Sequence, residues 1–563
     1  MKSFWNIDIL KLQENSNVTL YGWVQNIRKM GNLNFVDFRD RSAIVQLVFN
    51  NKIDFTKESV LKVEGILKKR KSPNLDLNTG AFEIEVIDYK IYSKSIELPF
   101  EIKNNDIQAK EDTRLHYRFL DLRRNKMFNN LFLRYKIMKR ARDWFDENGF
   151  LEIETPILSK STPEGARDFL VPTRKETKFF ALPQSPQIYK QLLMISGVER
   201  YFQFCRAFRD EDMRKDRQPE FTQLDIEMSF IDEESLFTLM EDLYKNIMDV
   251  VGYKINTPFR KINYDEAIDQ YGTDKPDLRY EYKLVELTNY LKDSNSFFKN
   301  EESIKGLIFD KNISSSQIKM LEEIALKNKT DKLISIKIKD SSFNDNNLNN
   351  SIELELKKII KDFNIKDATL FITKGKYLET TQSLGAVRVK LNELFSLAKQ
   401  DCYEFAWIVQ WPMFEIDDDG NLASAHHPFT SPTEDTIKFL DNEPLKVRAR
   451  SYDLVLNGFE LSSGSIRIID KDLQTKMFEI LKLSQKEIEE KFGFFINAFQ
   501  YGVPPHGGLA FGIDRLIMIL ANETSIREVI AFPKNANGID VMLNSPSFVD
   551  DNQLKELGLK KKN

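Results

Sequence analysis

The sequence has 563 residues, too many for one hydrophobic core, and this length suggests roughly three or four domains. With 41% hydrophobic and 30% charged residues it has the composition of a soluble globular protein, which excludes disordered and membrane classes. Its net charge of −4 argues against a protein that coats nucleic acid nonspecifically, although a local basic patch such as residues 68–71 is compatible with RNA binding.

Targeting and cysteine signals narrow the class further. No stretch approaches the ~20 apolar residues of a membrane helix, and the N-terminus lacks the apolar core of a secretory signal. Cys205 and Cys402 are the only cysteines, so neither a disulfide framework nor a cysteine-rich zinc site is available. We therefore expect a cytoplasmic protein with no membrane partner.

The first hundred residues predict a small β-barrel. Short segments rich in β-branched, aromatic or other apolar residues alternate there with Gly, Asn and Asp. These segments are residues 18–24, 33–38, 43–49 and 60–65. About five short strands in this length suit a closed barrel of the oligonucleotide-binding (OB) type. We assign residues 1–100 to it and expect a linker over 101–127.

A mixed helix–strand domain follows over residues 128–272. Apolar residues recur at helical spacing from Phe128, and Asn148 with Gly149 predicts the end of that helix. Residues 150–156 then predict a strand. From 273 to 405 the pattern changes to Lys-rich amphipathic helices, short strands and a polar loop at 339–350. No cluster suited to catalysis is evident there, and we interpret this segment as an insertion.

Two predicted strands, residues 200–208 and 220–230, flank a very charged loop at 209–217. Period-two alternation places Leu224, Ile226, Met228 and Phe230 on one face of the second strand, and Gln223, Asp225, Glu227 and Ser229 on the other. Asp is unfavourable in mid-strand, so Asp225 suggests a functional surface, whereas a solvent-facing sheet is the structural alternative. Arg209 and Arg217 in the loop can grip a triphosphate, because a guanidinium fork suits phosphate.

The last part of the chain, residues 406–563, carries further candidates. Small residues at 507–512 and the apolar helix after them place Arg515 at a buried strand-to-helix junction, where its partner is an anion or Asp514. The chain has no GxxxxGK loop, so ATP would not be held in P-loop fashion. Asn457 and Gly458 predict a hairpin that brings Asp453 and Glu460 together as oxygen ligands for Mg²⁺.

Two loops complete this set. Small residues at 462–464 allow close backbone approach to a ligand, and Arg467 projects from the strand beyond them. His426 and His427 lie in a loop that we interpret as covering a substrate rather than holding a metal. His116 and His506 are expected to be structural.

Six of these stretches, in this order, resemble motifs of the class II aminoacyl-tRNA synthetases, and among them the bacterial-type aspartyl-tRNA synthetases. They are residues 150–156, 162–168, 184–190, 208–221, 426–432 and 512–515. The resemblance covers nearly the whole chain and implies an α+β protein. It would have an N-terminal OB-type anticodon-binding barrel, an antiparallel-sheet catalytic domain and the large α+β insertion of the bacterial form. It also implies a homodimer.

The resemblance assigns roles position by position. Arg209 and Arg515 would be catalytic. The aspartate site would comprise Glu164, Gln187, Ile188, Tyr189, Lys190, Arg209, Asp225, His426 and Arg467. ATP would contact Arg209, Asp210, Glu211, Gln218, Glu460, Gly512, Ile513, Asp514 and Arg515, with Mg²⁺ on Asp453 and Glu460. Phe35 and Gln46 would bind anticodon bases, although an aromatic in a strand is more often core. Residues 462–464 depart from the glycine run usual in the family.

The implied activity is ATP-dependent attachment of L-aspartate to tRNA(Asp) through an aspartyl-adenylate. Neither step needs a protein nucleophile, in keeping with a site rich in Arg and acidic residues. Lys190 and Arg467 would select aspartate, so we expect Arg467→Leu to abolish aspartate activation and to leave the fold intact. The alternatives are an asparaginyl- or lysyl-type enzyme, a noncatalytic RNA-binding relative, and a form that also charges tRNA(Asn). The contribution of the insertion stays open.

Overall fold

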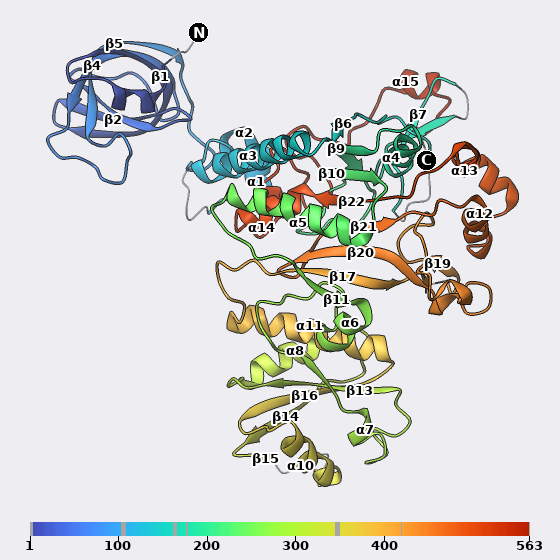
Figure 1. The fold of residues 1–563 in the computed structure, drawn as a ribbon. Helices are drawn as coiled ribbons and strands as arrows, with labels where there is room; N and C mark the ends of the chain where they lie inside the picture. Colours follow the sequence, from blue (N-terminus) through green and yellow to red (C-terminus); the bar gives the residue numbers. More distant parts are fainter. Residues whose placement is uncertain are drawn as a thin grey trace. The chain divides into compact units, whose positions relative to one another are not determined.

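The computed structural model describes residues 4–102, 108–161, 166–175, 178–343, 350–417 and 419–561. The chain divides into two compact units, Met1–Ala109 and Lys110–Asn563, and each is described by itself (Figure 1). No helix in these described ranges is long and apolar enough to cross a bilayer.

The first unit is a closed five-stranded barrel with the strand order β1-β2-β3-β5-β4. Its strands are β1 (Asn17–Met30), β2 (Leu33–Arg39), β3 (Ile44–Phe49), β4 (Val60–Lys69) and β5 (Phe82–Ser93), preceded by the 3-10 helix η1 (Asn6–Lys11). Alternate side chains such as Val36, Phe38 and Leu47 point inward and are completely buried. The predicted OB-type barrel is therefore confirmed.

The second unit is built on an eight-stranded sheet with the order β11-β17-β20-β21-β22-β10-β9-β6. The six central strands run antiparallel to one another, and the two edge strands, β11 and β6, run parallel to β17 and β9. The strands are β6 (Leu151–Glu152), β9 (Arg200–Phe208), β10 (Glu220–Ser229), β11 (Arg260–Asn263), β17 (Phe405–Pro412), β20 (Arg448–Leu456), β21 (Phe459–Ile466) and β22 (His506–Gly512).

Helices cover one face of this sheet and form its main core. These helices are α3 (Asn125–Glu147), α5 (Glu233–Asp249) and α14 (Ile513–Leu520) (Figure 1). Their apolar residues pack against inward side chains of the central strands. Asn148 ends α3 and Gly149 follows with φ +73°, as the sequence predicts. A second core includes residues of α4 (Gln187–Ile195), α6 (Tyr264–Tyr271), α12 (Lys471–Ile480) and α13 (Gln485–Ala498).

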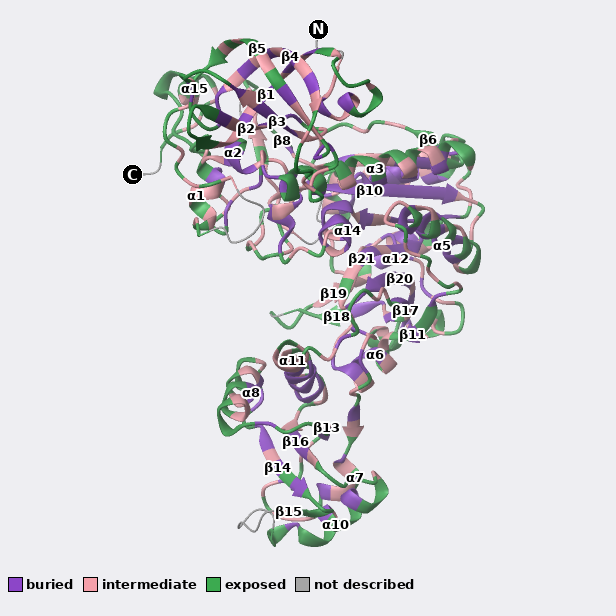
Figure 2. Ribbon diagram, turned by 90° about the vertical axis from the view of Figure 1, so that its left-hand side faces the viewer, coloured by how far each residue is buried: buried purple, intermediate pink, exposed green. Residues whose placement is uncertain are grey.

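β10 shows the predicted alternation. Leu224, Ile226 and Met228 lie in the main core, and Figure 2 shows the strand buried along most of its length. Phe230 is an exception, because the strand ends at Ser229 and a φ of +57° turns Phe230 outward, leaving it 71% exposed. The alternative of a solvent-facing sheet is wrong, since Asp225 and Glu227 on the other face are completely buried.

The segment predicted as an insertion contains its own five-stranded sheet, ordered β12-β13-β16-β14-β15. Its strands are β12 (Leu284–Glu286), β13 (Ser303–Phe309), β14 (Ile334–Lys339), β15 (Ser342–Phe343) and β16 (Ala368–Gly375). One core holds α7 (Thr288–Leu291) and α10 (Glu353–Asp362) on the sheet, and another holds α8 (Ser315–Lys327) and α11 (Tyr377–Phe395). β15 lies in the predicted polar loop, of which residues 344–349 are outside the described residues.

The expected linker over residues 101–127 is wrong for most of its length. Residues within it form α1 (Glu111–His116) and α2 (Arg118–Asp121), and α3 begins at Asn125. Arg118 and Asp121 are buried and form an ion pair with an Nη1–Oδ2 distance of 2.7 Å. Because these buried groups are charged, the sequence has the composition of a solvated linker.

The remaining elements of the second unit are short. They are β7 (Leu170–Pro172), β8 (Phe179–Ala181), β18 (Phe414–Ile416), β19 (Leu422–Ser424), η2 (Ile437–Phe439), η3 (Pro444–Lys446), η4 (Phe499–Tyr501), η5 (Ile526–Glu528) and α15 (Asp551–Glu556).

At Gly464 the neighbouring strands β21 and β22 approach each other closely. A Cβ at this position would lie 2.2 Å from the carbonyl oxygen of Gly508 and 2.5 Å from Cβ of Leu509, so alanine must push β21 and β22 apart. We expect Gly464→Ala to lower the free energy of unfolding by ~1–3 kcal/mol, measured by urea unfolding with tryptophan fluorescence. Gly493→Ala is the matched control, because its Cβ meets only Glu489 at 3.6 Å inside helix α13. An unchanged midpoint for Gly464→Ala would contradict the constraint.

Candidate active site

A cavity of about 490 Å³ opens on the polar face of the eight-stranded sheet. Most of the residues predicted for a substrate site line it, although they come from distant parts of the chain. They are Gln187, Lys190, Arg209, Glu211, Gln218, Asp225, His426, Asp453, Glu460, Arg467, Gly512, Asp514 and Arg515. The sheet brings them together because β10, β21 and β22 are neighbours in space although β10 and β21 are more than two hundred residues apart in sequence.

Two buried cations and two buried carboxylates form a cluster in the cavity. Nζ of Lys190, on α4, lies 2.9 Å from Oδ1 of Asp225 and 3.2 Å from Oε2 of Glu227. Arg467 donates from Nε and Nη2 to the two oxygens of Glu227, at 2.9 and 3.1 Å. Glu227 is therefore shared by both cations.

Burial and charge act against each other on the two carboxylates. Burial raises the pKa of Asp225, and the neighbouring Lys190 offsets this only in part. Burial alone would also raise the pKa of Glu227, but Arg467 and Lys190 outweigh it and lower the pKa to about 2. Glu227 is thus the firmly ionised member of the cluster.

Arg467 also binds the histidine loop. Its Nη1 lies 2.5 Å from Nε2 of His427 and donates to the hydroxyl of Ser465 at 2.6 Å. Burial and the charge of Arg467 hold the pKa of His427 well below its usual range, so Nε2 of the neutral ring accepts this bond. His427 therefore fixes the guanidinium, and His426 lines the cavity beside it, with its ring 4.8 Å from that of Trp411.

The two predicted phosphate-binding arginines lie on different elements of the same cavity. Arg209 begins the β9–β10 loop (residues 209–219), and its guanidinium lies 5.2 Å from the ring centroid of Phe221. Arg515 follows the start of α14, donates from Nη1 to the carbonyl of Glu460, and pairs with Asp216 at 3.0 Å. The alternative of an Arg515–Asp514 pair is wrong.

Asp514 has different partners, on a neighbouring strand and helix. It pairs with Arg134 of α3 and accepts from the backbone N–H of Thr222 at 2.9 Å. Its carboxylate therefore fastens α14 to β10 and leaves the guanidinium of Arg515 directed to the cavity.

Several cavity-lining polar atoms are buried and have no hydrogen-bond partner within the described part of the chain. They include Nε of Arg209, Nε of Arg515, Nε2 of Gln187 and Oε1 of Gln223. A buried donor or acceptor without a partner is costly, and a polar ligand in the cavity would satisfy it.

The predicted hairpin that carries Asp453 and Glu460 is confirmed. β20 and β21 are joined by Asn457 and Gly458, both with positive φ, as a type I′ turn requires. Both carboxylates line the cavity, and burial raises the pKa of Asp453 against the opposing effect of His426. Mg²⁺ commonly binds one or two carboxylates and completes its shell with waters and phosphate oxygens, so this pair fits it.

Comparison with known proteins decides the family. Residues 110–536 match the family described as tRNA synthetases class II (D, K and N), and residues 18–98 match the OB-fold nucleic acid binding domain. The chain belongs to the class II tRNA synthetases.

Individual relatives extend this match over nearly the whole chain. The chain is 47% identical to the aspartate–tRNA ligase of Malacoplasma penetrans, with 96% of each protein covered. It is 46% identical to the aspartate–tRNA(Asp/Asn) ligase of Dictyoglomus turgidum, over 96% of this chain and 95% of that protein. The asparaginyl-tRNA synthetase of Entamoeba histolytica, solved with asparaginyl-adenylate, has a TM-score of 0.59 over 93% of this chain and 96% of its own. At 20% identity that likeness concerns the fold.

Some predicted site residues of this class II synthetase lie outside the cavity. Ile188 packs in the second core, and the hydroxyl of Tyr189 lies 3.3 Å from that of Ser159. Asp210 is exposed, and Ile513 is buried in the main core. The side chains of these four residues therefore do not line the cavity, and Glu164 lies outside the described residues.

Other residues of the synthetase line or adjoin the cavity although the sequence analysis did not select them. The sequence could have indicated both Glu227, which shares the strand face of Asp225, and His427, which neighbours His426. No sequence pattern indicated Asp274, because it lies at the start of the segment interpreted as an insertion without catalytic residues. Next to it, Lys275 reaches within 3.4 Å of Glu460. The insertion therefore supplies residues at the cavity.

In the barrel, Phe35 and Gln46 lie on the outer face of neighbouring strands. Phe35 is half-buried between inward-facing neighbours, so it is not part of the barrel core. The amide of Gln46 accepts from Arg28 at 3.2 Å and donates to Glu83 at 2.7 Å. These contacts hold a polar side chain in place close to an aromatic one, an arrangement suited to unpaired bases.

Glu227 predicts a pH dependence of stability. Its pKa falls from an ordinary 4.5 to about 2 on folding, so its stabilising effect is complete above about pH 4.5 and is lost as the pH falls toward 2. We expect Glu227→Gln to destabilise the protein by ~3 kcal/mol near pH 7, because Arg467 loses its buried counter-ion. The difference in the free energy of unfolding between this variant and the wild type should become smaller when urea unfolding is measured at successively lower pH, from 6 to 3. A difference that stays constant with pH would contradict this account.

Proposed function

We propose that this class II synthetase is an aspartate–tRNA ligase that activates L-aspartate with ATP and transfers it to tRNA(Asp). The observation that carries the proposal is the cation pair of Lys190 and Arg467, buried in a cavity that also holds Arg209 and Arg515. The names of relatives at 44–47% identity support it.

In the first step an oxygen of the substrate's α-carboxylate attacks the α-phosphorus of ATP in line, and pyrophosphate leaves. Arg209 and Arg515 would neutralise the charge that develops on the phosphates, and Phe221 would offer a ring face to the adenine. Glu211 and Gln218 would orient the nucleotide. Asp453 and Glu460 would hold Mg²⁺, which supplies charge neutralisation to the phosphates when bound.

In the second step the terminal hydroxyl of tRNA attacks the aspartyl carbonyl, and AMP leaves. The protein again contributes position and charge rather than a nucleophile, which agrees with the groups that line the cavity. In the barrel, Phe35 would stack on an anticodon base and Gln46 would hydrogen-bond to another. We propose that the enzyme works in the cytoplasm, where tRNA and ATP are available.

Selection of aspartate would rest on Lys190 and Arg467. An aspartate side chain offers both cations a carboxylate, whereas asparagine offers an amide whose N–H₂ faces their N–H groups. Sites that leave buried polar groups unsatisfied can discriminate by about 10⁴ or more. Asp225, buried beside Lys190, would accept from the substrate's amino group.

The amino-acid specificity is tested by ATP–pyrophosphate exchange with aspartate, asparagine and lysine, and we expect exchange with aspartate alone. Arg467→Leu should abolish this exchange. Because that change leaves Glu227 with Lys190 alone, we now expect a stability loss of ~3–5 kcal/mol rather than an intact fold. Arg467→Lys keeps the charge and serves as the folded comparison, with a raised KM for aspartate. Aspartate-dependent exchange retained in Arg467→Leu would overturn the assignment.

Two rival functions give different results in the same assays. ATP binding without formation of aspartyl-adenylate would indicate a noncatalytic relative. Aminoacylation of purified tRNA(Asp) and tRNA(Asn) separates the proposed enzyme from one that charges both, a form suggested by the name of the Dictyoglomus turgidum relative.

We also propose a homodimer, and an exposed apolar surface supports it. Phe128, Phe132 and Tyr135 stack along α3 with ring centroids 6.1 Å apart, and Leu151 of β6 is 54% exposed nearby in sequence. Monomeric soluble proteins rarely expose large contiguous apolar patches, and such patches mark interaction sites. The occupant that fits this proposal is the same surface of a second copy.

The dimer is tested with Phe132→Glu, which places a charge in the centre of the aromatic row. We expect this variant to sediment as a monomer where the wild type is a dimer, because a buried unpaired carboxylate opposes association. Leu354→Glu is the matched control, since Leu354 is 79% exposed on the insertion. A wild-type monomer at micromolar concentration, or a dimeric Phe132→Glu variant, would count against the proposal.

A further inference from the structure

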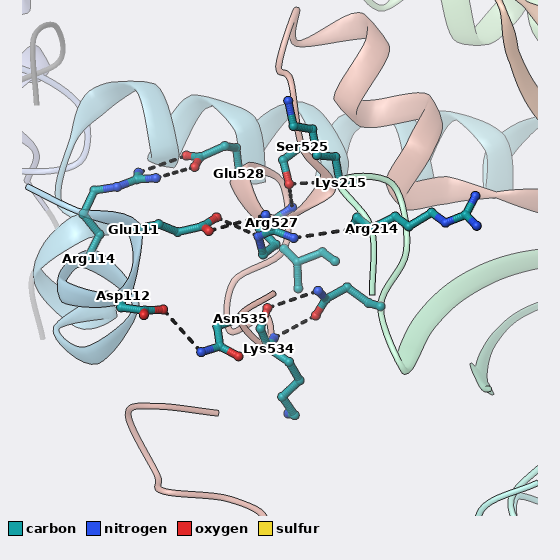
Figure 3. Close-up of polar contacts among 12 residues, drawn as sticks. Glu111, Asp112, Arg114, Arg214, Lys215, Ser525, Arg527, Glu528, Lys534 and Asn535 are labelled. Carbon is teal, nitrogen blue, oxygen red and sulfur yellow. Dashed lines mark hydrogen bonds and ion pairs between the residues drawn. The ribbon is translucent and has the colours of Figure 1, made fainter. Parts of the chain in front are cut away.

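A network of polar contacts joins the β9–β10 loop to other parts of the second unit (Figure 3). It joins three segments that are distant in sequence: α1, the β9–β10 loop, and residues 525–535 after α14. None of its ion pairs belongs to the cation–carboxylate cluster of the cavity, and the proposed chemistry gives no role to these ion pairs.

Arg527 is the centre of this network. Its side chain is only 9% exposed, and Nε donates to Oε1 of Glu111 at 2.6 Å, with Nη2 3.4 Å from the other carboxylate oxygen. Nη1 donates to the carbonyl of Arg214 at 3.4 Å, within the β9–β10 loop. One buried guanidinium thus connects α1 to the loop.

The neighbours of Arg527 hold the same loop through its backbone. The N–H of Ile526 and the hydroxyl of Ser525 both donate to the carbonyl of Lys215, at 2.9 and 3.1 Å. Further along, Gln218 accepts from the N–H of Lys534 at 2.7 Å and donates to its carbonyl at 3.1 Å. The loop is therefore fixed at both ends of its second half.

The segment 525–535 is in turn fixed by α1 and α2. Arg118 donates to the carbonyls of Arg527 and Ile530, at 2.7 and 2.8 Å, and Arg114 forms a two-point ion pair with Glu528, at 2.6 and 3.2 Å. Burial opposes ionisation of Glu528, but Arg114 outweighs it and holds the pKa of this carboxyl below its usual value. Helices α1 and α2 are thus the support on which segment 525–535 rests.

The supported loop carries groups that face the nucleotide end of the cavity. Asp216, between the two anchored positions, pairs with Arg515, and Arg217 and Gln218 line the cavity. Ile526 lines it too, from the supporting segment. A shift of α1 would therefore move the loop and change the alignment of Arg515.

We propose that the Glu111–Arg527 ion pair positions the β9–β10 loop for ATP, so that α1 is a positioning element of the ATP site. Because α1 begins two residues after the barrel unit ends along the chain, this element is also where the barrel's polypeptide enters the catalytic unit. The inference rests on the proposed function, since it assigns this loop to ATP.

The test uses Arg527→Ala, Glu111→Gln and the double variant in the full-length protein. Two readouts are compared: the Kd for ATP without aspartate, and the KM values for ATP and for aspartate in pyrophosphate exchange. We expect the Kd and KM for ATP to rise about tenfold in Arg527→Ala while the KM for aspartate changes less than twofold. The double variant should show the same Kd and KM for ATP as Arg527→Ala, because both changes break the same Glu111–Arg527 ion pair. Arg527→Lys, which keeps the charge but not the fork, should be intermediate.

The matched control is Arg450→Ala, which removes a similar two-point ion pair with Glu233, at 2.8 and 2.6 Å, outside the cavity. A melting temperature lowered as in this control, with ATP binding unchanged, would reduce Arg527 to a structural role and overturn the inference. Equal rises in both KM values, or additive effects in the double variant, would also overturn it. Weakened ATP binding in Arg527→Ala, beside a wild type that forms no aspartyl-adenylate, would refute the proposed function and leave this inference standing.

Discussion

The structure depends on the neutralisation of two cations that are buried in the cavity. Lys190 and Arg467 are each at most 3% exposed, and a buried charge without a counter-ion is strongly destabilising. Glu227 pairs with both from the middle of β10. The neighbouring strand β22 must leave room for it, because a Cβ on Gly508 would lie 2.1 Å from the carbonyl oxygen of Ile226 and 2.2 Å from the Glu227 carboxylate. The ion cluster and the close backbone of β10 thus together require glycine at position 508 of the neighbouring strand.

The sequence predicted those parts of the fold and site whose cause is local. The hairpin at Asn457 and Gly458 follows from two residues that accept positive φ, and the face of Asp225 follows from the period of a strand. The barrel likewise follows from alternating short strands. Motif resemblance then identified side chains that line one cavity, although spacing in the sequence could not show that they meet.

The parts that escaped prediction depend on contacts between distant segments. Glu227 was placed on the correct strand face, but only the fold reveals that Lys190 and Arg467 share it. Residues 101–127 were interpreted as a linker that continues the polar stretch at its start, yet Arg118 and Asp121 within this range are buried against each other. Polar composition predicts exposure only where the charges have no buried partners, and the sequence alone does not list those partners.

The cavity joins two regions of different construction, and this difference has a mechanical consequence. The Lys190–Glu227–Arg467 cluster lies on strands and a helix of the core, where any rearrangement breaks buried ion pairs. The end of the cavity that we propose for the nucleotide is formed largely by a loop that includes the exposed Arg217 and is anchored through backbone carbonyls. A rigid binding site suits discrimination between amino acids that differ by one group, because a flexible site would adapt to the wrong amino acid. A loop held by a few hydrogen bonds suits a site that must exchange ATP, pyrophosphate and AMP in every cycle.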